Sequence, residues 1–340
     1  MSGTTRPVEI VGGGLAGLSL GLALRHSGVP VTVFEAGVYP RHRVCGEFIS
    51  GLGPATIARL GLEPHLAGAV PQDEVSWFVR ERFVCRHRLP QPALAISREV
   101  LDARLAGAFT AAGGRLHLRT RIDPADQRPG RVLANGRQRA RSAWVGLKAH
   151  VRGLPFGAGL EMHVGERGYA GLCRLPGGAV NVCGLFRRRA VVRTDEGALP
   201  AYLAASGLAA LAQQLNAAEI VPGSEVAVAG FGFAPAAQAG EVRLGDARLM
   251  LPPLIGNGMA AAFQAAEEAL GPLVAWSRRA AAWPEACAGI RRGLDRRFGR
   301  RERCAPFLHR LLLSPWPQGC FAWLGRRGLL PFALLYRLTH

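Results

Sequence analysis

The feature that most constrains this chain is a glycine-rich turn set between two apolar runs. A short strand-like run precedes Gly12, Gly14 and Gly17, which have the spacing Gly-x-Gly-x-x-Gly, and an apolar helical segment follows them. A β-branched run then ends at Glu35, 18 positions after Gly17. The chain therefore begins with a strand, a tight turn, a helix and a second strand, which together form a βαβ unit.

This arrangement is typical of a dinucleotide-binding turn. Gly12 permits the tight turn, Gly14 lets the backbone approach a diphosphate, and Gly17 allows the helix to pack closely on the strand. The N–H groups and the dipole of the helix N-terminus favour negative charge there. A carboxylate at Glu35 accepts hydrogen bonds from a ribose and disfavours a 2′-phosphate. The turn therefore predicts FAD or NAD, and not NADP.

Two later segments favour FAD over NAD. Gly245 and Asp246 follow a strand-like run, and an Asp in that position is suited to hold ribityl hydroxyls. Gly256 and Gly258 open an Ala-rich helical segment, whose backbone N–H groups suit the electron-rich end of an isoalloxazine. Three such segments in this order predict an FAD site.

Charge and cysteine usage exclude several other classes of protein. The 340 residues carry a formal net charge of +18, so the surface attracts anions, but no nucleic-acid recognition motif is present and we expect no nucleic-acid binding. The seven cysteines lack paired spacing, which predicts neither a disulfide framework nor a metal site and suits a cytoplasmic protein. No apolar stretch approaches the ~18 residues of a transmembrane helix.

The chain resembles the FAD-dependent group that includes p-hydroxybenzoate hydroxylase-like monooxygenases and geranylgeranyl reductases. The matching segments are GGGLAGLSLGLALRHSGVPVTVFEA, ISREVLDARL and GDARLMLPPLIGNGMAAAF, and they cover most of residues 8–275. The resemblance implies that Arg98 reaches the FAD, that Gly245 and Asp246 bind its ribityl and pyrophosphate groups, and that residues 256–259 line the flavin. The predicted cofactor-binding residues are Gly12, Gly14, Leu15, Ala16, Gly17, Glu35, Ala36, Arg43, Arg98, Gly245, Asp246, Gly256, Asn257, Gly258 and Met259.

A loop motif supplies two candidate catalytic residues. Residues 41–48 read RHRVCGEF, which is similar to the Cys-Gly-Gly segment beside the flavin in geranylgeranyl reductases, with Glu47 in place of the second glycine. By this resemblance Cys45 lies near the flavin ring. Glu47 is a candidate to accept or donate a proton, and Arg43 to neutralise a pyrophosphate. The alternative is a loop that only packs on FAD.

Lys148 and His150 are two further candidates. Lys148 is the single lysine of the chain, and it lies two residues before His150 on a predicted strand. Residues two apart on a strand face the same way, and both side chains titrate near neutrality when partly buried. We predict an acid–base pair or a binding site for an anionic or phenolic substrate. A solvated strand face is the alternative.

The element pattern predicts a two-lobed α/β flavoprotein with a Rossmann-like FAD-binding lobe, an antiparallel β-sheet substrate lobe and a C-terminal helical segment. The aromatic residues of that last segment stand among arginines, as in a helical cap, which we favour, or in a peripheral membrane surface that meets anionic lipid. The predicted ranges are 1–70, 96–143 and 225–275 for the FAD-binding lobe, 71–95 and 144–224 for the substrate lobe, and 276–340 for the helical region.

Two chemistries follow from the resemblance, and both use FAD reduced by a transiently bound NADH or NADPH. We favour a monooxygenase that uses O2 to hydroxylate an aromatic or polyketide-like small molecule. The alternative is a reductase of prenyl or lipid double bonds, in which Cys45 or another acid supplies a proton. A non-catalytic flavin-binding protein is a third hypothesis, because Asn135-Gly136 stands where the oxygenase group carries Asp-Gly.

Overall fold

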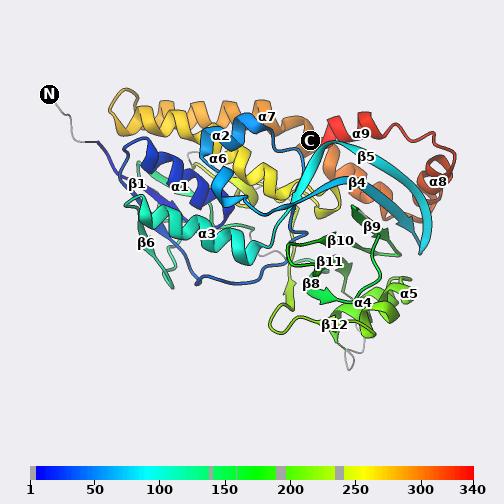
Figure 1. Ribbon diagram of the computed structural model, residues 1–340. Coiled ribbons are helices and arrows are strands. Elements are labelled where there is room, and N and C mark those ends of the chain that lie inside the picture. Colours follow the sequence, from blue (N-terminus) through cyan, green and yellow to red (C-terminus); the bar gives the residue numbers. More distant parts are fainter. Residues whose placement is uncertain (1–4, 138–140, 158, 189–196, 234–240) are drawn as a thin grey trace.

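The computed structural model describes residues 5–137, 141–157, 159–188, 197–233 and 241–340. Two lobes lie side by side, and a long helix runs along both of them (Figure 1). The lobe that contains the N-terminal strand is called the first lobe below, and the lobe that contains the larger sheet is called the second lobe.

A small parallel sheet forms the centre of the first lobe, with the strand order β6-β2-β1-β7. Arg243 extends this sheet through an isolated parallel bridge to Leu133. Strands β1, β2 and β7 are short, mostly apolar and largely buried, as expected for parallel strands covered on both faces, whereas the edge strand β6 is mostly exposed. They are β1 (Val8–Val11), β2 (Val31–Phe34), β6 (Arg115–His117) and β7 (Arg131–Leu133).

Three helices build the core of the first lobe on this sheet. Helix α1 (Leu15–His26) is apolar on nearly all sides, and it is buried between α3 (Arg98–Ala111) and α6 (Gly258–Ser277), both of which it contacts. Ser97 caps α3, because its hydroxyl accepts a hydrogen bond from the Glu99 N–H at 3.2 Å. The short helices α2 (Pro54–Leu60), η1 (Glu63–His65), η2 (Gly245–Ala247) and η3 (Pro253–Ile255) complete the helical elements of the first lobe.

The second lobe is built on a nine-stranded sheet with the order β12-β8-β11-β10-β9-β4-β5-β3, and β13 also pairs with β8. All pairs are antiparallel except that between β4 and β9. Strand β13 lies in the range that the sequence assigns to the FAD-binding lobe, but it pairs with the second sheet. The strands are β3 (Phe48–Ile49), β4 (Val70–Val79), β5 (Arg82–Ala95), β8 (Trp144–Arg152), β9 (Leu160–Val164), β10 (Gly168–Arg174), β11 (Val180–Arg187), β12 (Glu219–Ile220) and β13 (Val226–Ala229).

Alternation along β8 decides which side chains can take part in a site. Leu147 and Ala149 face an apolar cluster formed with α4 (Ala198–Ala205) and α5 (Ala209–Asn216). Lys148 and His150 therefore point to the opposite, inner face of the sheet, where the loop after β2 lies.

Three C-terminal helices follow α6. The first half of α7 (Trp283–Leu312) packs into the core of the first lobe through Ile290 and Leu294, and its last residues join the core of the second lobe. Helices α8 (Pro315–Arg326) and α9 (Phe332–Thr339) continue at the end of the molecule that carries the second sheet (Figure 1). The predicted combination of a Rossmann-like lobe, a mostly antiparallel sheet and a C-terminal helical segment is thus confirmed.

Candidate functional site

The glycine turn has the tight geometry that its spacing predicts. Gly12 adopts φ +111°, and a Cβ atom there would lie 2.3 Å from the Ala134 carbonyl oxygen. A Cβ on Gly17 would lie 2.0 Å from the Gly12 carbonyl oxygen. A Cβ on Gly14, by contrast, would meet nothing within 4 Å. The N-terminus of α1 therefore opens on free space beside Gly14, as a diphosphate-binding turn requires.

Glu35 closes the other side of this turn. Its carboxylate is buried and accepts hydrogen bonds from the Gly13 N–H and the Gly37 N–H, both at 2.8 Å, and from Arg41 Nη2 at 2.7 Å. These three bonds use most of the acceptor capacity of the carboxylate. Glu35 thus braces the turn, and one position remains on it for a ribose hydroxyl.

An excess of positive charge lies next to the turn. The fully buried Asp102 of α3 accepts bonds from Arg98 Nε (2.8 Å) and Nη2 (2.9 Å) and from Arg43 Nε (3.0 Å). Arg43 Nη2 makes no hydrogen bond to the described residues and lies 3.9 Å from the Glu35 carboxylate. Burial and the neighbouring Arg98 charge lower the pKa of Arg43. Two guanidinium groups on one carboxylate leave a local positive charge that suits an anionic ligand.

The later cofactor-binding candidates border the same region. Burial among surrounding protein raises the pKa of the Asp246 carboxyl on η2, and the nearby charges of Arg98 and Arg137 oppose this effect. The Asp246 side chain is nevertheless open to solvent, as expected for a residue in a concave site. Asn257 stands at the N-cap position of α6 without a side-chain capping bond, and its amide donates to the Thr339 carbonyl oxygen. Leu15 and Ala16 begin α1, Ala36 follows Glu35, Gly256 precedes the Asn257 cap, and Gly258 and Met259 begin α6.

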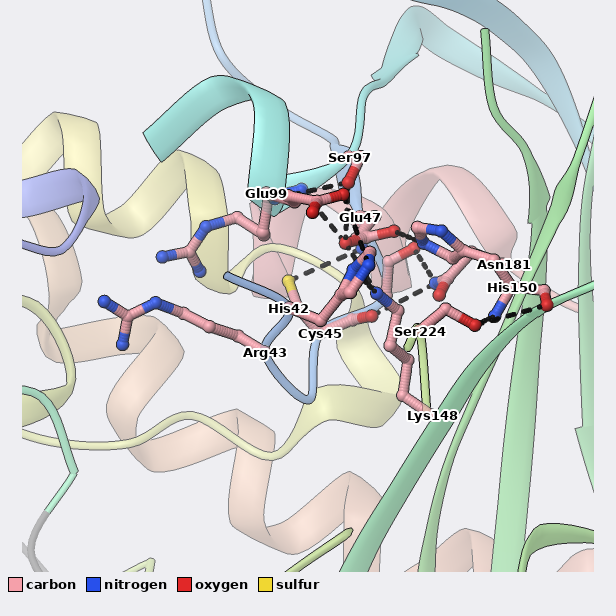
Figure 2. Close-up of polar contacts among 12 residues, drawn as sticks. His42, Arg43, Cys45, Glu47, Ser97, Glu99, Lys148, His150, Asn181 and Ser224 are labelled. Carbon is pink, nitrogen blue, oxygen red and sulfur yellow. Dashed lines mark hydrogen bonds and ion pairs between the residues drawn. The ribbon is translucent and has the colours of Figure 1, made fainter. Parts of the chain in front are cut away.

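The structure brings three of the four catalytic candidates into direct contact (Figure 2). Glu47 accepts a hydrogen bond from Lys148 Nζ on Oε1 at 3.1 Å, and its Oε2 lies 2.5 Å from His150 Nε2. All three residues are buried. Burial alone would raise the pKa of Glu47, but the hydrogen bond with His150 and the charge of Lys148 hold it below its usual value. The Glu47 carboxylate is therefore ionised inside the protein at neutral pH.

Glu47 occupies an unusual backbone conformation. Its φ of +59° lies in the left-handed region, which favours glycine. The position is the one where the resembling reductases carry their second glycine. The carboxylate also accepts a hydrogen bond from the Arg98 N–H at 3.0 Å and one from the Ser97 hydroxyl at 3.4 Å. Four polar contacts thus hold a residue whose backbone cost is of the order of 1 kcal/mol, as is common at functional sites.

His42 extends this group of side chains toward the surface. Its Nδ1 lies 3.1 Å from Lys148 Nζ, and its Nε2 lies 3.2 Å from the Glu99 carboxylate, which is about one third exposed. Burial, and next the charge of Lys148, lower the pKa of His42 below its usual value. The contacts form an unbroken series from His150 through Glu47, Lys148 and His42 to Glu99, which we call the His150–Glu99 chain.

The loop that carries Glu47 is pinned to the second sheet. The Asn181 amide of β11 donates to the carbonyl oxygens of Cys45 (3.1 Å) and Gly46 (2.9 Å). On its other side, the loop touches the segment predicted to line the flavin, because a Cβ on Gly256 would lie 2.5 Å from the Phe48 ring. The loop therefore connects the cofactor-binding candidates with the acid–base candidates.

The fourth catalytic candidate, Cys45, lies apart from the acid–base contacts. Its thiol accepts a hydrogen bond from the Glu47 backbone N–H at 3.4 Å, whereas the Glu47 carboxylate on the same loop contacts Lys148 and His150. Burial raises the pKa of the thiol, against the opposing effect of Arg98. Cys45 thus carries its proton at neutral pH and is placed toward the Arg98 side of the loop.

Sequence reasoning missed four residues of this region: His42, Asp102, Glu99 and Asn181. Asp102 follows Arg98 by four positions on α3, so the (i, i+4) spacing is a signal that was available. His42 lies in the RHRVCGEF motif, but nothing in its spacing connects it with Lys148. Asn181 becomes visible only through strand register, where it lies opposite His150.

A metal ion is the other ligand that these side chains suggest. One donor atom each from His42, Glu47 and His150 lies within 4.8 Å of the others. Lys148 Nζ, however, is 3.1 Å from both His42 Nδ1 and Glu47 Oε1, so its ammonium group takes the position that a cation would occupy. The donor set therefore fits a lysine ion pair better than a metal.

Comparison with known proteins shows which family model and which solved structures this chain is similar to. Residues 10–56 match the NAD(P)-binding Rossmann-like domain family. No curated protein sequence matches the chain. Solved structures match nearly its whole length, among them p-nitrophenol 4-monooxygenase PnpA from Pseudomonas putida DLL-E4, with 12% identity, a TM-score of 0.75, and coverage of 98% of this chain and 97% of that chain. HpxO from Klebsiella pneumoniae, complexed with FAD and uric acid, matches with 18% identity and a TM-score of 0.73, and the match covers 98% of this chain and 95% of that chain. The flavin-dependent brominase Bmp2 matches with 16% identity and a TM-score of 0.65, and the match covers 97% of each chain.

The chain has the fold of the FAD-dependent monooxygenases. The predicted fold class, and the predicted resemblance to the p-hydroxybenzoate hydroxylase-like group, are confirmed at the level of the fold. A brominase shares this fold, so the chemistry has to be argued from the side chains of this chain.

Proposed function

We propose that this protein is an FAD-dependent monooxygenase that hydroxylates an aromatic small molecule with NADH or NADPH and O2. The observation that carries the proposal is the loop from Arg43 to Phe48. One part of this loop faces the positively charged glycine turn, and the next part holds a buried carboxylate against Lys148 and His150. The structural neighbours act on or bind p-nitrophenol and uric acid, which supports an aromatic or heteroaromatic substrate.

The residues near the turn fit FAD. The open space beside Gly14 and the unsatisfied Arg43 Nη2 would receive the diphosphate, with Arg98 close by. Asp246 would hold ribityl hydroxyls, and residues 256–259 would line the ring. Bound flavin would supply the redox chemistry with O2, and the protein would supply orientation, shielding from water and proton transfer.

The acid–base contacts supply that proton transfer. Hydroxylation of an aromatic ring is favoured when a phenol on the ring loses its proton, because the phenolate donates more electron density. His150 is the proposed acceptor of this proton. Glu47 stabilises the resulting imidazolium through the 2.5 Å contact, and Lys148 balances the charge of Glu47 when the imidazole is neutral.

The His150–Glu99 chain would return the proton to solvent. His150 passes a proton to Glu47 Oε2, and the carboxyl group then turns so that this proton faces Lys148. Lys148 passes one of its own protons to His42 and takes the Glu47 proton as the replacement. His42 takes the proton on Nδ1 and releases one from Nε2 to Glu99 or to water. Each contact in the series is 3.2 Å or shorter, which is within hydrogen-bond reach. One proton enters at His150 and one leaves at Glu99.

Reconstitution with FAD tests the proposal. Purified protein incubated with excess FAD and then desalted is expected to stay yellow, to oxidise NADH or NADPH, and to consume O2 in the presence of a phenolic substrate. Mass spectrometry of the product is expected to show a gain of one oxygen atom from ¹⁸O2. Protein that stays colourless after FAD incubation would contradict the cofactor assignment, and turnover that is independent of O2 would contradict the monooxygenase assignment.

Lys148→Met tests the acid–base assignment within the same assay. The variant is expected to bind FAD as the wild type does, because Lys148 lies outside the residues proposed to hold it. Its turnover is expected to fall by about 100-fold, which is typical for loss of acid–base assistance. Unchanged turnover with unchanged substrate affinity would exclude the role.

A further inference from the structure

Helix α8 exposes an apolar stripe that its own packing does not need. Trp316 and Trp323 are 80% and 49% exposed, and with Cys320, also exposed, they follow the i, i+4, i+7 spacing of one helix face. The opposite face is buried, where Gln318 donates to the Gly165 and Leu312 carbonyl oxygens and Gly325 packs against Val84. The helix is therefore held by one face and presents tryptophan on the other.

The adjoining C-terminal elements expose further apolar side chains. Phe307 near the end of α7, Leu329 after α8 and Leu334 on α9 are 63%, 58% and 50% exposed. Five of the nine exposed large hydrophobic residues among the described residues thus fall between positions 307 and 334. Single exposed hydrophobic residues are ordinary, so the informative feature is their concentration on consecutive elements at one end of the chain. We call this group the C-terminal surface: Phe307, Trp316, Trp323, Leu329 and Leu334.

The charged side chains of the C-terminal segment itself have one sign. Residues 303–340 contain five arginines and no aspartate or glutamate. All five arginines are exposed, and none of them forms an ion pair within the part of the chain that the structure describes. One of them, Arg327, lies 4.4 Å from the Trp323 ring centroid, so apolar and basic groups stand together. They are Arg303, Arg310, Arg326, Arg327 and Arg337.

This chemistry selects the partner. A second copy of the chain would bring the same arginines face to face, which like-charge repulsion opposes. An anionic lipid surface offers negative headgroups to the arginines and an apolar boundary to the tryptophans, which favour the membrane interface. In the described part of the chain, every helix is too short or too polar to cross a bilayer, so contact would be from one side.

We propose that the C-terminal surface binds the protein to the surface of an anionic lipid membrane, with the exposed face of α8 in the headgroup region. The proposal does not depend on the flavin chemistry, because every residue that carries it lies on the C-terminal elements. Figure 1 shows α8 and α9 at the end of the molecule that carries the second sheet, away from α1 and the glycine turn. Membrane binding through α8 would therefore leave the glycine turn free.

Vesicle co-sedimentation tests the proposal. The full-length protein is mixed with vesicles of phosphatidylcholine alone or of phosphatidylcholine with phosphatidylglycerol in equal parts. Binding is expected to be about tenfold stronger to the anionic vesicles, and to weaken when salt is raised from 0.1 to 0.5 M. A double variant, Trp316→Ser with Trp323→Ser, is expected to lose about tenfold in binding, as is the double variant Arg326→Gln with Arg327→Gln.

Matched controls come from the first lobe. Leu118→Ser replaces an exposed hydrophobic residue there, and Arg115→Gln with Arg119→Gln removes the same charge as the Arg326 and Arg327 changes. These variants are expected to bind vesicles as the wild type does. Equal binding to neutral and anionic vesicles, or equal losses in test and control variants, would overturn the proposal. The proposal would also be overturned if the wild type bound no vesicles and instead formed a dimer that the tryptophan double variant abolishes. Circular dichroism and thermal unfolding verify that each variant is folded.

Discussion

At the scale of single residues, Glu47 decides what the site can do. A carboxylate inside a protein normally takes up a proton, because burial disfavours its charged form. Here Lys148 and His150 supply enough compensation to hold the pKa of Glu47 below its usual value of 4.5. The same contacts hold the residue in a backbone conformation that suits glycine. The ionised carboxylate of Glu47 thus helps to maintain the left-handed backbone conformation of this residue.

Glu47→Gln is expected to lower the free energy of unfolding by about 3 kcal/mol at pH 7, because it leaves the Lys148 charge buried without its partner. The pKa of Glu47 is lowered in the folded protein, so its contribution is complete above pH 4.5 and is lost as the pH falls through the lower folded value. Urea unfolding at pH 7 measures the difference. Glu74→Gln, in a partly exposed pair with Arg86 at 3.8 Å, is expected to cost about 0.5 kcal/mol or less. Equal costs would contradict the interpretation.

His42 tests the His150–Glu99 chain in a second way. His42→Ala is expected to lower kcat by about 10-fold to 100-fold at pH 7, since the proton would lose its route to Glu99. Added imidazole is expected to restore part of the rate, which a purely structural defect would not allow. FAD affinity is expected to stay unchanged. His65→Ala on η1 is the control, and an imidazole response in that variant, or none in His42→Ala, would argue against the chain.

Residue patterns predicted part of this site. Strand alternation put Lys148 and His150 on one face, and their contacts with Glu47 follow from that face. The spacing could not show that the loop before β3 crosses the same face, because the link depends on pairing between residues about 100 positions apart. His42 was missed for that reason: its partner Lys148 lies 106 positions away in the sequence.

At the scale of elements, two glycines of the same turn have different roles: one allows close packing, and the other leaves space open. Gly17 is needed for packing, since a Cβ there would lie 2.0 Å from the Gly12 carbonyl oxygen. Gly14 is not needed for packing, since a Cβ there would meet nothing within 4 Å. If the open space beside Gly14 receives the cofactor diphosphate, substitutions at the two positions must fail in different ways.

Gly14→Ala is therefore expected to fold with a Tm close to that of the wild type and to lose at least about tenfold in FAD affinity, because the added methyl group would stand in the way of the diphosphate. Gly17→Ala is expected to lose stability by about 2 kcal/mol or more, because backbone must move. Thermal unfolding without FAD and titration of flavin fluorescence measure the two quantities. A Gly14→Ala protein that binds FAD normally would remove the diphosphate from this turn.

Elements with strong local signals can be recognised from the sequence alone. Ser97 and Glu99 mark the start of α3, and the structure begins the helix at Arg98. Strand β13 shows the limit of such signals. Its apolar residues identify a strand, but its assignment to a sheet depends on pairing Val226 with Lys148, far away in the sequence. Local pattern carries strand propensity and leaves the choice of partner to the whole fold.

At the scale of the whole molecule, α7 joins the two lobes. Its N-terminal half packs in the first core, and His309 near its end contacts Trp144 and Tyr169 of the second sheet, with ring centroids 5.3 and 5.8 Å apart. Burial, with the charge of Arg310, lowers the pKa of His309 to about 4. The sequence predicted a helical region here. It gave no sign that a histidine would be buried where the lobes meet.

This buried histidine makes the joint between the lobes sensitive to acid. His309 stays neutral in the folded protein down to about pH 4, whereas in the unfolded chain it takes up a proton near pH 6.5. Between these values the unfolded state binds more protons, so stability falls as the pH falls, by about 2 kcal/mol from pH 7 to pH 5 for this group.

The variant His309→Gln removes this titrating group. Between pH 7 and pH 5 the variant is therefore expected to lose about 2 kcal/mol less stability than the wild type loses. His117→Gln, at an exposed position, is expected to keep the wild-type difference. Urea unfolding of the three proteins at both pH values measures the difference directly, because all titrating groups other than His309 and His117 are common to the three. Equal pH dependence in the wild type and His309→Gln would mean that His309 is protonated in the folded protein and that α7 is not held by a neutral, buried imidazole.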